Sequence, residues 1–293
     1  MSLAVEARNL SIAYGSQTVV RGLSFSLEAG KIHGLLGRNG SGKTTLLSVI
    51  AALRQPNSGT ILVGGEAPYE TPRVTHEVAL IRASGDVPDS CRVGEALAVA
   101  ARFRPHWDQA FADRLLDRFK IARRKRYSTL SRGQQSAVGI VLGLASRAPL
   151  TLFDEAYLGL DAPGRYVFYQ ELLDDYIAHP RTIVLSTHLI EEVADLFESV
   201  LMINDGTLLI HDSADALRTR GAAIIGPAEA VDAATRGLTI LNSRSLGRTK
   251  SVTVYGDIDD DSRRRIASAG IEVAPVPLQD LFVHLTAPSE VAS

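Results

Sequence analysis

The chain has 293 residues, of which 45% are hydrophobic and 22% are charged, a composition typical of a soluble globular protein. A formal net charge of −2 gives no general argument for nucleic acid or an anionic membrane as a partner. No apolar run reaches the ~18 residues that a spanning helix needs, and the first residues do not resemble a secretory signal. The single cysteine, Cys91, excludes an internal disulfide and is expected to fill space on a half-buried helix.

The first part of the chain is predicted to consist of short strands. Residues 3–14 and 19–27 alternate apolar and polar side chains, so they are expected to pair as a hairpin around Gly15-Ser16. A continuous apolar run at 31–36 predicts a buried strand. Further short strands are predicted at 60–63 and at about 78–81.

From about residue 93 to 147 the hydrophobic period becomes helical. Asp108 is the predicted N-cap of one helix, because apolar side chains follow it on a single helical face. After residue 147, buried strands alternate with helices, which is typical of a mainly parallel sheet covered on both faces. These strands are expected at 150–153 and 182–185, and the helices at about 163–178 and 188–197.

The pattern changes after Asp212. Residues 222–285 are predicted to form strand, helix, strand, strand, helix and strand, and a last short helix begins at Leu278. The order β-α-β-β-α-β is that of a ferredoxin-like unit. We therefore predict two domains, a large α/β domain at residues 1–213 and a small α+β accessory domain at residues 214–293.

Residues 37–44 fit the phosphate-binding pattern G-x-x-x-x-G-K-[ST]. Glycines let successive backbone N–H groups point into one concavity, and the start of the following helix favours a phosphate. Lys43 can reach the β- and γ-phosphates, and the Thr44 hydroxyl can bind Mg²⁺. The alternative is a glycine-rich turn between strand and helix. The candidate nucleotide-binding residues are Gly37, Arg38, Asn39, Gly40, Ser41, Gly42, Lys43, Thr44 and Thr45.

A second candidate group is the pair Asp154-Glu155, at the end of the predicted strand 150–153. In a nucleotide site, an Asp at such a strand end holds Mg²⁺ and the next Glu can orient an attacking water. An isolated Asp-Glu pair is more often a solvated strand end. Its position downstream of a phosphate loop favours the catalytic interpretation.

The segment Leu130-Ser131-Arg132-Gly133-Gln134-Gln135 resembles the signature motif, usually LSGGQ, of the ATP-binding cassette (ABC) ATPases. The motif opens a predicted helix, so its side chains and N–H groups can face a phosphate. By itself it would be an ordinary helix cap. The resemblance covers about residues 3–212 and implies that Ser131, Gly133 and Gln134 contact ATP held by the opposing subunit.

The resemblance also implies roles for residues that the pattern alone would not single out. Tyr14 matches the aromatic residue that stacks on adenine, and Asp161 matches an interface residue of the loop after the acidic pair. His188 matches the switch histidine that senses the γ-phosphate, Glu155 the general base, and Asp154 a Mg²⁺ holder. Without the resemblance, Tyr14 would be an ordinary strand tyrosine and His188 an ordinary helix start.

Two positions depart from the family pattern. Arg132 replaces a glycine of the signature motif, which is tolerable where the side chain points away. The glutamine expected after the strand at 78–81 is missing, and Ala83 or Ser84 falls nearest its place. Two explanations remain open: hydrolysis is slow, or another group such as Asp86 substitutes.

The resemblance implies a P-loop NTPase fold with a mainly parallel core sheet, an antiparallel β subdomain and a helical subdomain at about 86–147. ATP and Mg²⁺ are the implied ligands. The implied partners are membrane permease subunits and a second ATPase subunit, identical or homologous, at the cytoplasmic face of the membrane; nucleic acid is not expected. The C-terminal extension resembles subunits of ABC-2-type exporters. The alternatives are a soluble ABC ATPase acting on ribosomes or DNA, and a slow ATP-dependent regulatory clamp.

Overall fold

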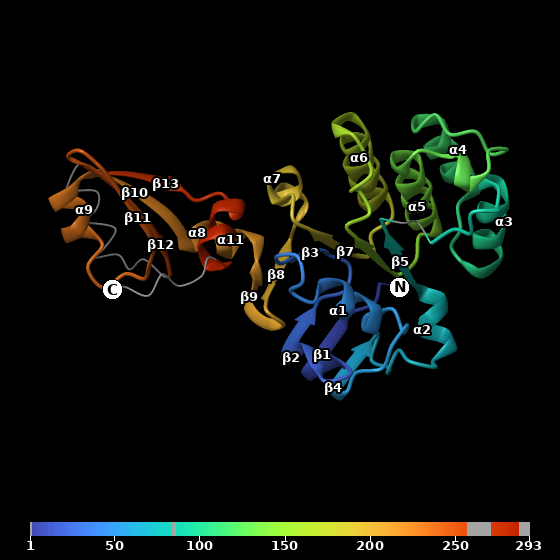
Figure 1. Ribbon diagram of the computed structural model, residues 1–293, viewed down its shortest axis with the longest axis horizontal. Helices are drawn as coiled ribbons and strands as arrows, with labels where there is room; N and C mark the ends of the chain where they lie inside the picture. Colours follow the sequence, from blue (N-terminus) through green and yellow to red (C-terminus); the bar gives the residue numbers. More distant parts are fainter. Residues whose placement is uncertain (1, 84–85, 257–270, 287–293) are drawn as a thin grey trace. The chain divides into compact units, whose positions relative to one another are not determined.

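The computed structural model describes residues 2–83, 86–256 and 271–286, and the chain divides into two compact units. The first unit consists of residues 1–188 and 195–211, and the second of residues 189–194 and 212–293. Figure 1 labels the elements of both. Within the described ranges, none of the helices has the length and apolar character required to cross a bilayer.

The first unit contains a six-stranded sheet in the order β5-β6-β7-β3-β8-β9. The pairs β5–β6, β6–β7, β7–β3 and β3–β8 are parallel. Every residue of β3, β6 and β7 is buried, which explains why these strands are continuous apolar runs in the sequence. The strands are β3 (Ile32–Leu36), β5 (Val78–Arg82), β6 (Leu150–Asp154), β7 (Thr182–Thr187), β8 (Ser199–Asn204) and β9 (Thr207–Ser213).

A smaller antiparallel sheet has the order β2-β1-β4. In Figure 1, this sheet and α1 lie on one face of the six-stranded sheet, and α5 and α6 cover the other. The predicted combination of a mainly parallel sheet, an antiparallel β part and a helical part is therefore confirmed. The elements are β1 (Val5–Tyr14), β2 (Gln17–Leu27), β4 (Ser58–Val63), α1 (Lys43–Ile50), α5 (Arg132–Ser146) and α6 (Ala162–Ala178).

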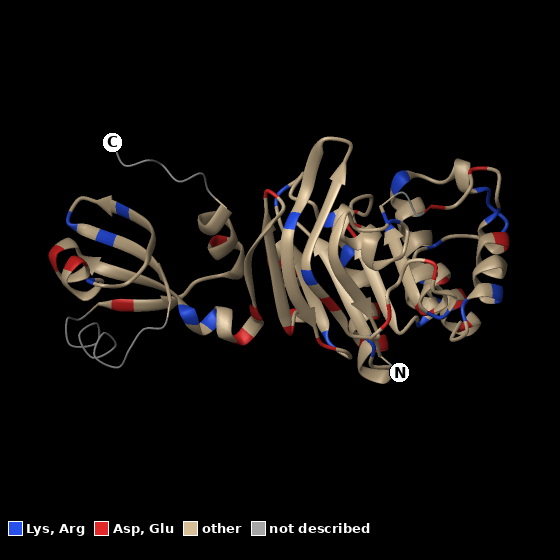
Figure 2. Ribbon diagram, turned by 90° about the horizontal axis from the view of Figure 1, so that it is seen from below, with Lys and Arg blue, Asp and Glu red and all other residues tan. Residues whose placement is uncertain are grey.

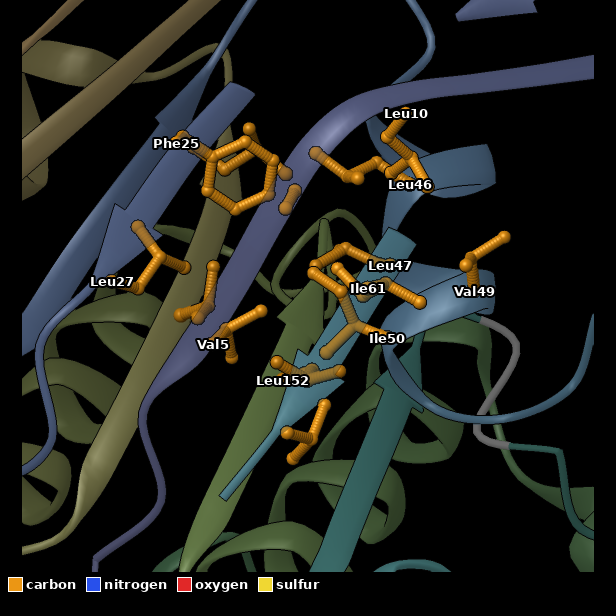
Figure 3. Packing of buried hydrophobic residues seen from close by; sticks show 14 of the residues in the cluster. Val5, Leu10, Phe25, Leu27, Leu46, Leu47, Val49, Ile50, Ile61 and Leu152 are labelled. Carbon is orange, nitrogen blue, oxygen red and sulfur yellow. The ribbon is translucent and has the colours of Figure 1, made fainter. Parts of the chain in front are cut away.

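The main core lies between the two sheets, around α1 (Figure 3). Leu46, Leu47 and Ile50 of α1 are all buried, and they pack in one cluster with Val5 of β1 and Leu152 of β6. This packing fixes the helix that follows the phosphate loop to both sheets. The start of α1 is therefore held by apolar burial on two sides.

The helical part of the first unit contains α3, α4 and α5. Asp108 caps α4 as predicted, because its Oδ1 accepts a hydrogen bond of 2.8 Å from the Phe111 N–H. Cys91 lies in the bend before α3, so its predicted position on a helix was wrong. A helix that the sequence did not predict, α2, precedes β5. The bounds are α2 (Pro72–Glu77), α3 (Val93–Phe103) and α4 (Gln109–Arg118).

The second unit is built on an antiparallel sheet in the order β11-β12-β10-β13. Its own small core includes Ile224, Val231 and Val252. The second helix predicted for this unit falls on 257–270, outside the described residues. The elements are α8 (Ala214–Arg220), β10 (Gly221–Pro227), α9 (Ala228–Ala234), β11 (Ile240–Leu246), β12 (Thr249–Tyr255), β13 (Glu272–Pro275) and α11 (Leu278–Thr286).

The helix predicted at 188–197 is shorter than expected. It consists of α7 (Ile190–Val193) and a 3₁₀ turn at Ala194–Leu196. Helix α8 was not predicted, although Ser213 caps it through a hydrogen bond from the Ala216 N–H. Both errors concern short helices, for which the hydrophobic period covers too few turns to be distinctive.

The cap at Asp108 can be tested by two substitutions. Asp108→Ala removes both the cap and the 3.0 Å ion pair with Arg147, and we expect it to lower the free energy of unfolding by roughly 1–2 kcal/mol. Asp108→Asn keeps a capping oxygen and removes only the charge, so its loss should be smaller. Urea unfolding followed by circular dichroism measures both. Equal losses in the two variants would contradict the role of the cap.

Candidate functional site

The phosphate loop connects β3 to α1 along a path that only small residues allow. A Cβ added to Gly37 would lie 2.6 Å from the carbonyl oxygen of Ile203, and Gly42 has a left-handed φ of 104° at the N-cap of α1. The Ser41 N–H donates to the Arg38 oxygen at 3.1 Å, and the Gly206 N–H donates to the Ser41 oxygen at 3.1 Å. The end of β8 and the β8–β9 turn therefore contact the phosphate loop at Gly37 and Ser41.

Lys43 begins α1, and its side chain is only 5% exposed. Its Nζ donates hydrogen bonds to the carbonyl oxygens of Gly37 (2.7 Å) and Arg38 (3.2 Å), so the ammonium is held inside the loop. Thr44, the next residue, is exposed, while Thr45 is buried. The loop thus combines a fixed positive charge with a hydroxyl at the first turn of a helix.

The two predicted carboxylates lie where β6 ends, and they differ in their surroundings. Asp154 is 6% exposed, and its Oδ1 has no hydrogen-bond partner among the described residues. Glu155 has a left-handed φ of 50°, an uncommon conformation for a residue with a Cβ. Its Oε1 lies 3.5 Å from Lys43 Nζ. The end of β6 therefore brings a carboxylate to the phosphate loop.

His188 follows directly after β7 and lies in the same place. Its Nδ1 is 3.5 Å from Glu155 Oε1, so Lys43 and His188 approach one carboxylate oxygen. The Tyr157 hydroxyl contacts the same ring nitrogen at 3.3 Å. The structure therefore brings three of the predicted site residues, Lys43, Glu155 and His188, to one place, and adds Tyr157, which the sequence analysis did not single out.

Tyr14, the predicted adenine contact, lies at the end of β1 and is 50% exposed. The guanidinium of Arg54 lies over its ring, 3.9 Å from the centroid, and donates a hydrogen bond to the carbonyl oxygen of Ala13. Arg54 covers one face of the ring, so a base that stacks on Tyr14 would use the other face. No local pattern identifies Arg54, because 40 residues separate it from Tyr14.

The predicted signature residues form a second group around the start of α5. Ser131 is the N-cap: its Oγ accepts from the Gln134 N–H at 3.2 Å, and its N–H donates to Gln134 Oε1 at 3.4 Å. Gly133 packs on the loop after β6, since an added Cβ would lie 2.7 Å from the Gly159 oxygen. Asp161 caps α6 through the Gly164 N–H.

These residues line an open hollow of about 690 Å³. Arg118, Lys120 and Arg132 line it too, so the hollow carries three basic residues in addition to the N–H groups of α5. Arg132, whose side chain was expected to be able to point away, is thus one of the residues that line the hollow. The lining comprises Arg118, Phe119, Lys120, Ser131, Arg132, Gly133, Gln134, Ala137, Gly159, Leu160, Asp161, Pro163, Gly164 and Val167.

The segment that lacks the expected glutamine follows β5. Ala83 contributes its carbonyl oxygen, which accepts a hydrogen bond of 3.2 Å from Ser136 Oγ, and Ser84 lies outside the described residues. Asp86 is exposed and pairs with Arg82 at 3.3 Å. Burial, together with the charges of Asp86 and Asp89, raises the pKa of Tyr127 to about 12. The Asp86 carboxylate thus forms an ion pair with Arg82, and its charge contributes to the raised pKa of Tyr127.

The residues at this site fit a nucleotide accompanied by Mg²⁺. The unpartnered, buried Oδ1 of Asp154 is an oxygen ligand of the kind that Mg²⁺ takes, and Thr44 offers a hydroxyl. Across the described part of the chain, no group of three or more His, Cys, Asp and Glu side chains is placed to hold a metal ion. A Mg²⁺ ion here would depend on phosphate and water ligands in addition to those two residues.

Comparison with known proteins agrees with this geometry. A profile of the family described as "ABC transporter" matches residues 20–158. The Nod factor export ATP-binding protein I of Burkholderia orbicola is 30% identical over 224 residues, covering 74% of this chain and 73% of that protein. The chain belongs to the ABC transporter ATP-binding proteins. Members of this family hydrolyse ATP to power a transporter, so the predicted enzyme class and function are confirmed.

Two further proteins are similar to this chain over different lengths. The daunorubicin resistance ATP-binding protein DrrA3 of Streptomyces coeruleorubidus is 28% identical over 295 residues, covering 93% of this chain and 92% of that protein. A solved structure titled "Structure of ATP binding subunit of ABC transporter" superimposes with a TM-score of 0.66 at 25% identity. It covers 73% of this chain and 91% of that chain. The ABC ATPase fold is thereby confirmed.

The surroundings of Asp86 predict that it does not replace the missing glutamine. Its carboxylate is exposed and paired with Arg82, so we expect Asp86→Ala to leave Mg²⁺-dependent ATP turnover unchanged. Steady-state phosphate release measures this, with Arg82→Ala as the matched control that removes the partner of the ion pair. A large loss of turnover in Asp86→Ala alone would instead place Asp86 in the catalytic machinery.

Proposed function

We propose that Lys43, Glu155 and His188 are the catalytic residues of this ABC ATPase. Glu155 acts as the general base or orients the attacking water, and His188 senses the γ-phosphate. Lys43 and the amides of the phosphate loop stabilise negative charge on the transferred phosphoryl group. The observation that carries this proposal is the approach of Lys43 Nζ and His188 Nδ1, each at 3.5 Å, to Glu155 Oε1.

We assign the ligand contacts to the same loops. Tyr14 stacks on adenine, and the backbone of residues 37–45 surrounds the phosphates. Thr44 and Asp154 hold Mg²⁺, which supplies neutralisation of charge on the phosphates when it is bound. The buried Oδ1 of Asp154, which has no hydrogen-bond partner among the described residues, supports this assignment.

The second group of residues is proposed to serve ATP bound by another subunit. Ser131, Gly133, Gln134 and Asp161 line or cap the hollow at the start of α5, which is rich in N–H donors and basic side chains. Two ATPase subunits, identical or homologous, would bind two ATP molecules between them, each nucleotide contacting the phosphate loop of one and the signature motif of the other.

We infer that residues 1–213 are the ATP-binding domain, with a helical subdomain at about 86–147, and that residues 214–293 are a ferredoxin-like accessory domain. The strand order of the second sheet and the division of the chain into two compact units, with a boundary between residues 211 and 212, support this proposal. The chain would work with ABC-2-type permease subunits at the cytoplasmic face of the membrane. A relative named for Nod factor export supports an exporter.

A single substitution tests the catalytic proposal. Glu155→Gln removes the base and keeps the shape, so we expect ATP turnover to fall roughly a hundredfold or more while ATP binding is retained. Steady-state phosphate release and equilibrium binding of ATP measure the two properties. Glu77→Gln is the control, because Glu77 pairs with Arg73 outside the site. Equal, near-background rates for wild type and Glu155→Gln would instead support a regulatory clamp.

The same variant tests the partner. Tagged Glu155→Gln protein, loaded with ATP and Mg²⁺, should hold the closed dimer and co-purify from detergent-solubilised cells with a stoichiometric polytopic membrane protein. The Lys43→Ala variant, which loses the charge of the phosphate loop, is the control for ATP-dependent capture. Recovery of ribosomes or nucleic acid without a membrane protein would overturn the transporter assignment.

A further inference from the structure

The side chain of Tyr157 is buried beside the catalytic groups, yet the roles proposed above do not require it. It is 4% exposed, and its hydroxyl contacts Thr187 and His188 at the end of β7. Thr187 Oγ1 donates to it at 2.8 Å, the His188 backbone N–H donates to it at 3.2 Å, and His188 Nδ1 lies 3.3 Å away. We propose that Tyr157 is a positioning residue that keeps His188 in the tautomer with its proton on Nε2.

The argument rests on the donors and acceptors of the phenol. A tyrosine hydroxyl has one proton to donate and two lone pairs with which to accept. The Thr187 hydroxyl and the His188 N–H occupy both lone pairs, so the O–H of Tyr157 is donated to His188 Nδ1. A neutral imidazole carries one N–H proton. If Nδ1 accepts the hydrogen bond from Tyr157, the proton must therefore be on Nε2.

The position of the imidazole ring decides which nitrogen of His188 can contact a phosphate. His188 Nδ1 faces Tyr157 and Glu155, which leaves Nε2 as the nitrogen available to a phosphate oxygen. A phosphate oxygen accepts hydrogen bonds, so Nε2 must carry a proton in order to sense it. Tyr157 therefore prepares His188 to act as a donor.

The tautomer also separates the roles of His188 and Glu155. If Nδ1 carried the proton, it would donate toward Glu155 Oε1, 3.5 Å away, and that oxygen already lies 3.5 Å from Lys43 Nζ. A carboxylate that is paired with two donors is a weaker base. By donating to Nδ1, Tyr157 leaves Glu155 available to a water molecule. This inference rests on the proposed role of His188.

The tautomer can be observed directly, without ATP. Histidine labelled with ¹⁵N allows long-range ¹H–¹⁵N spectra at about pH 8.5, where an ordinary imidazole is neutral. The His188 signal is assigned by its loss in His188→Gln. We expect the unprotonated nitrogen of wild-type His188 to be Nδ1. Finding the proton on Nδ1 would overturn the proposal, and this wild-type spectrum decides even where a variant folds poorly.

The variant Tyr157→Phe keeps the ring and removes the hydroxyl. Losing one hydrogen bond of ordinary strength should raise the population with a proton on Nδ1 roughly fivefold. Tyr166→Phe is the matched control, because Tyr166 lies on α6 and is 66% exposed; it should leave the spectrum unchanged. An unchanged His188 spectrum in Tyr157→Phe would contradict the role of Tyr157.

A double-mutant cycle connects the tautomer to turnover. We expect Tyr157→Phe to lower Mg²⁺-dependent ATP turnover roughly fivefold in the wild-type background and to have no further effect in His188→Ala. An equal loss in both backgrounds would mean that Tyr157 does not act through His188. Full turnover in His188→Ala would refute the catalytic role of His188. It would not affect the tautomer result, which is measured on the wild-type protein without ATP.

Discussion

Parallel pairing of β7 with both β6 and β3 is the constraint on which the site depends. Leu36 at the end of β3 pairs with Thr187, and Asp154 at the end of β6 pairs with Ser186. Three carboxyl ends of parallel strands therefore meet at one edge of the sheet, where the phosphate loop, the acidic pair and His188 leave it. Residues far apart in the chain become neighbours because of this register, and parallel α/β sheets bind ligands at such edges.

The phosphate loop itself supplies the hydrogen-bond partners that allow the ammonium group of Lys43 to be buried. Removing an ammonium group from water is costly unless partners replace the lost hydration. Here the carbonyl oxygens of Gly37 and Arg38 replace it, and both residues belong to the phosphate loop. The backbone of the phosphate loop thus holds the lysine ammonium in place.

The sequence predicted those features that depend on local pattern or on contiguous motifs. Buried strands such as β3 and β6 are apolar runs, and the loop after each carries its chemistry within a few residues. Contacts that depend on tertiary structure were not predictable. Arg54 reaches Tyr14 across the β1 strand end, and the hydroxyl of Tyr157 meets His188, 31 residues away, only because β6 and β7 are neighbours.

Elements formed by residues close together in the sequence were not always predicted correctly either. Helix α7 has four residues, too few for the hydrophobic period to fix its length, and it belongs to the second compact unit.

The sequence alone also did not show which charged residues pair with each other. The basic run at 123–126 includes Arg123, which pairs with Asp113 at 2.6 Å, and Figure 2 shows acidic and basic residues interspersed over the helical part of the first unit.

The contacts around Ser136 join three segments near the place where the expected glutamine after β5 is missing. Ser136 lies on α5, one turn after the signature residues, and its Oγ donates to the carbonyl oxygen of Ala83. Any Cβ on Gly159 would collide with that same oxygen atom of Ser136 and would lie 2.6 Å from the Arg132 oxygen. The loop after β5, the start of α5 and the loop after β6 therefore meet within one turn of helix. A displacement of any one of them would change its contacts with the other two. The start of α5 thus contacts the loop after β5 through the Ser136 hydroxyl and packs closely on the loop after β6 at Gly159.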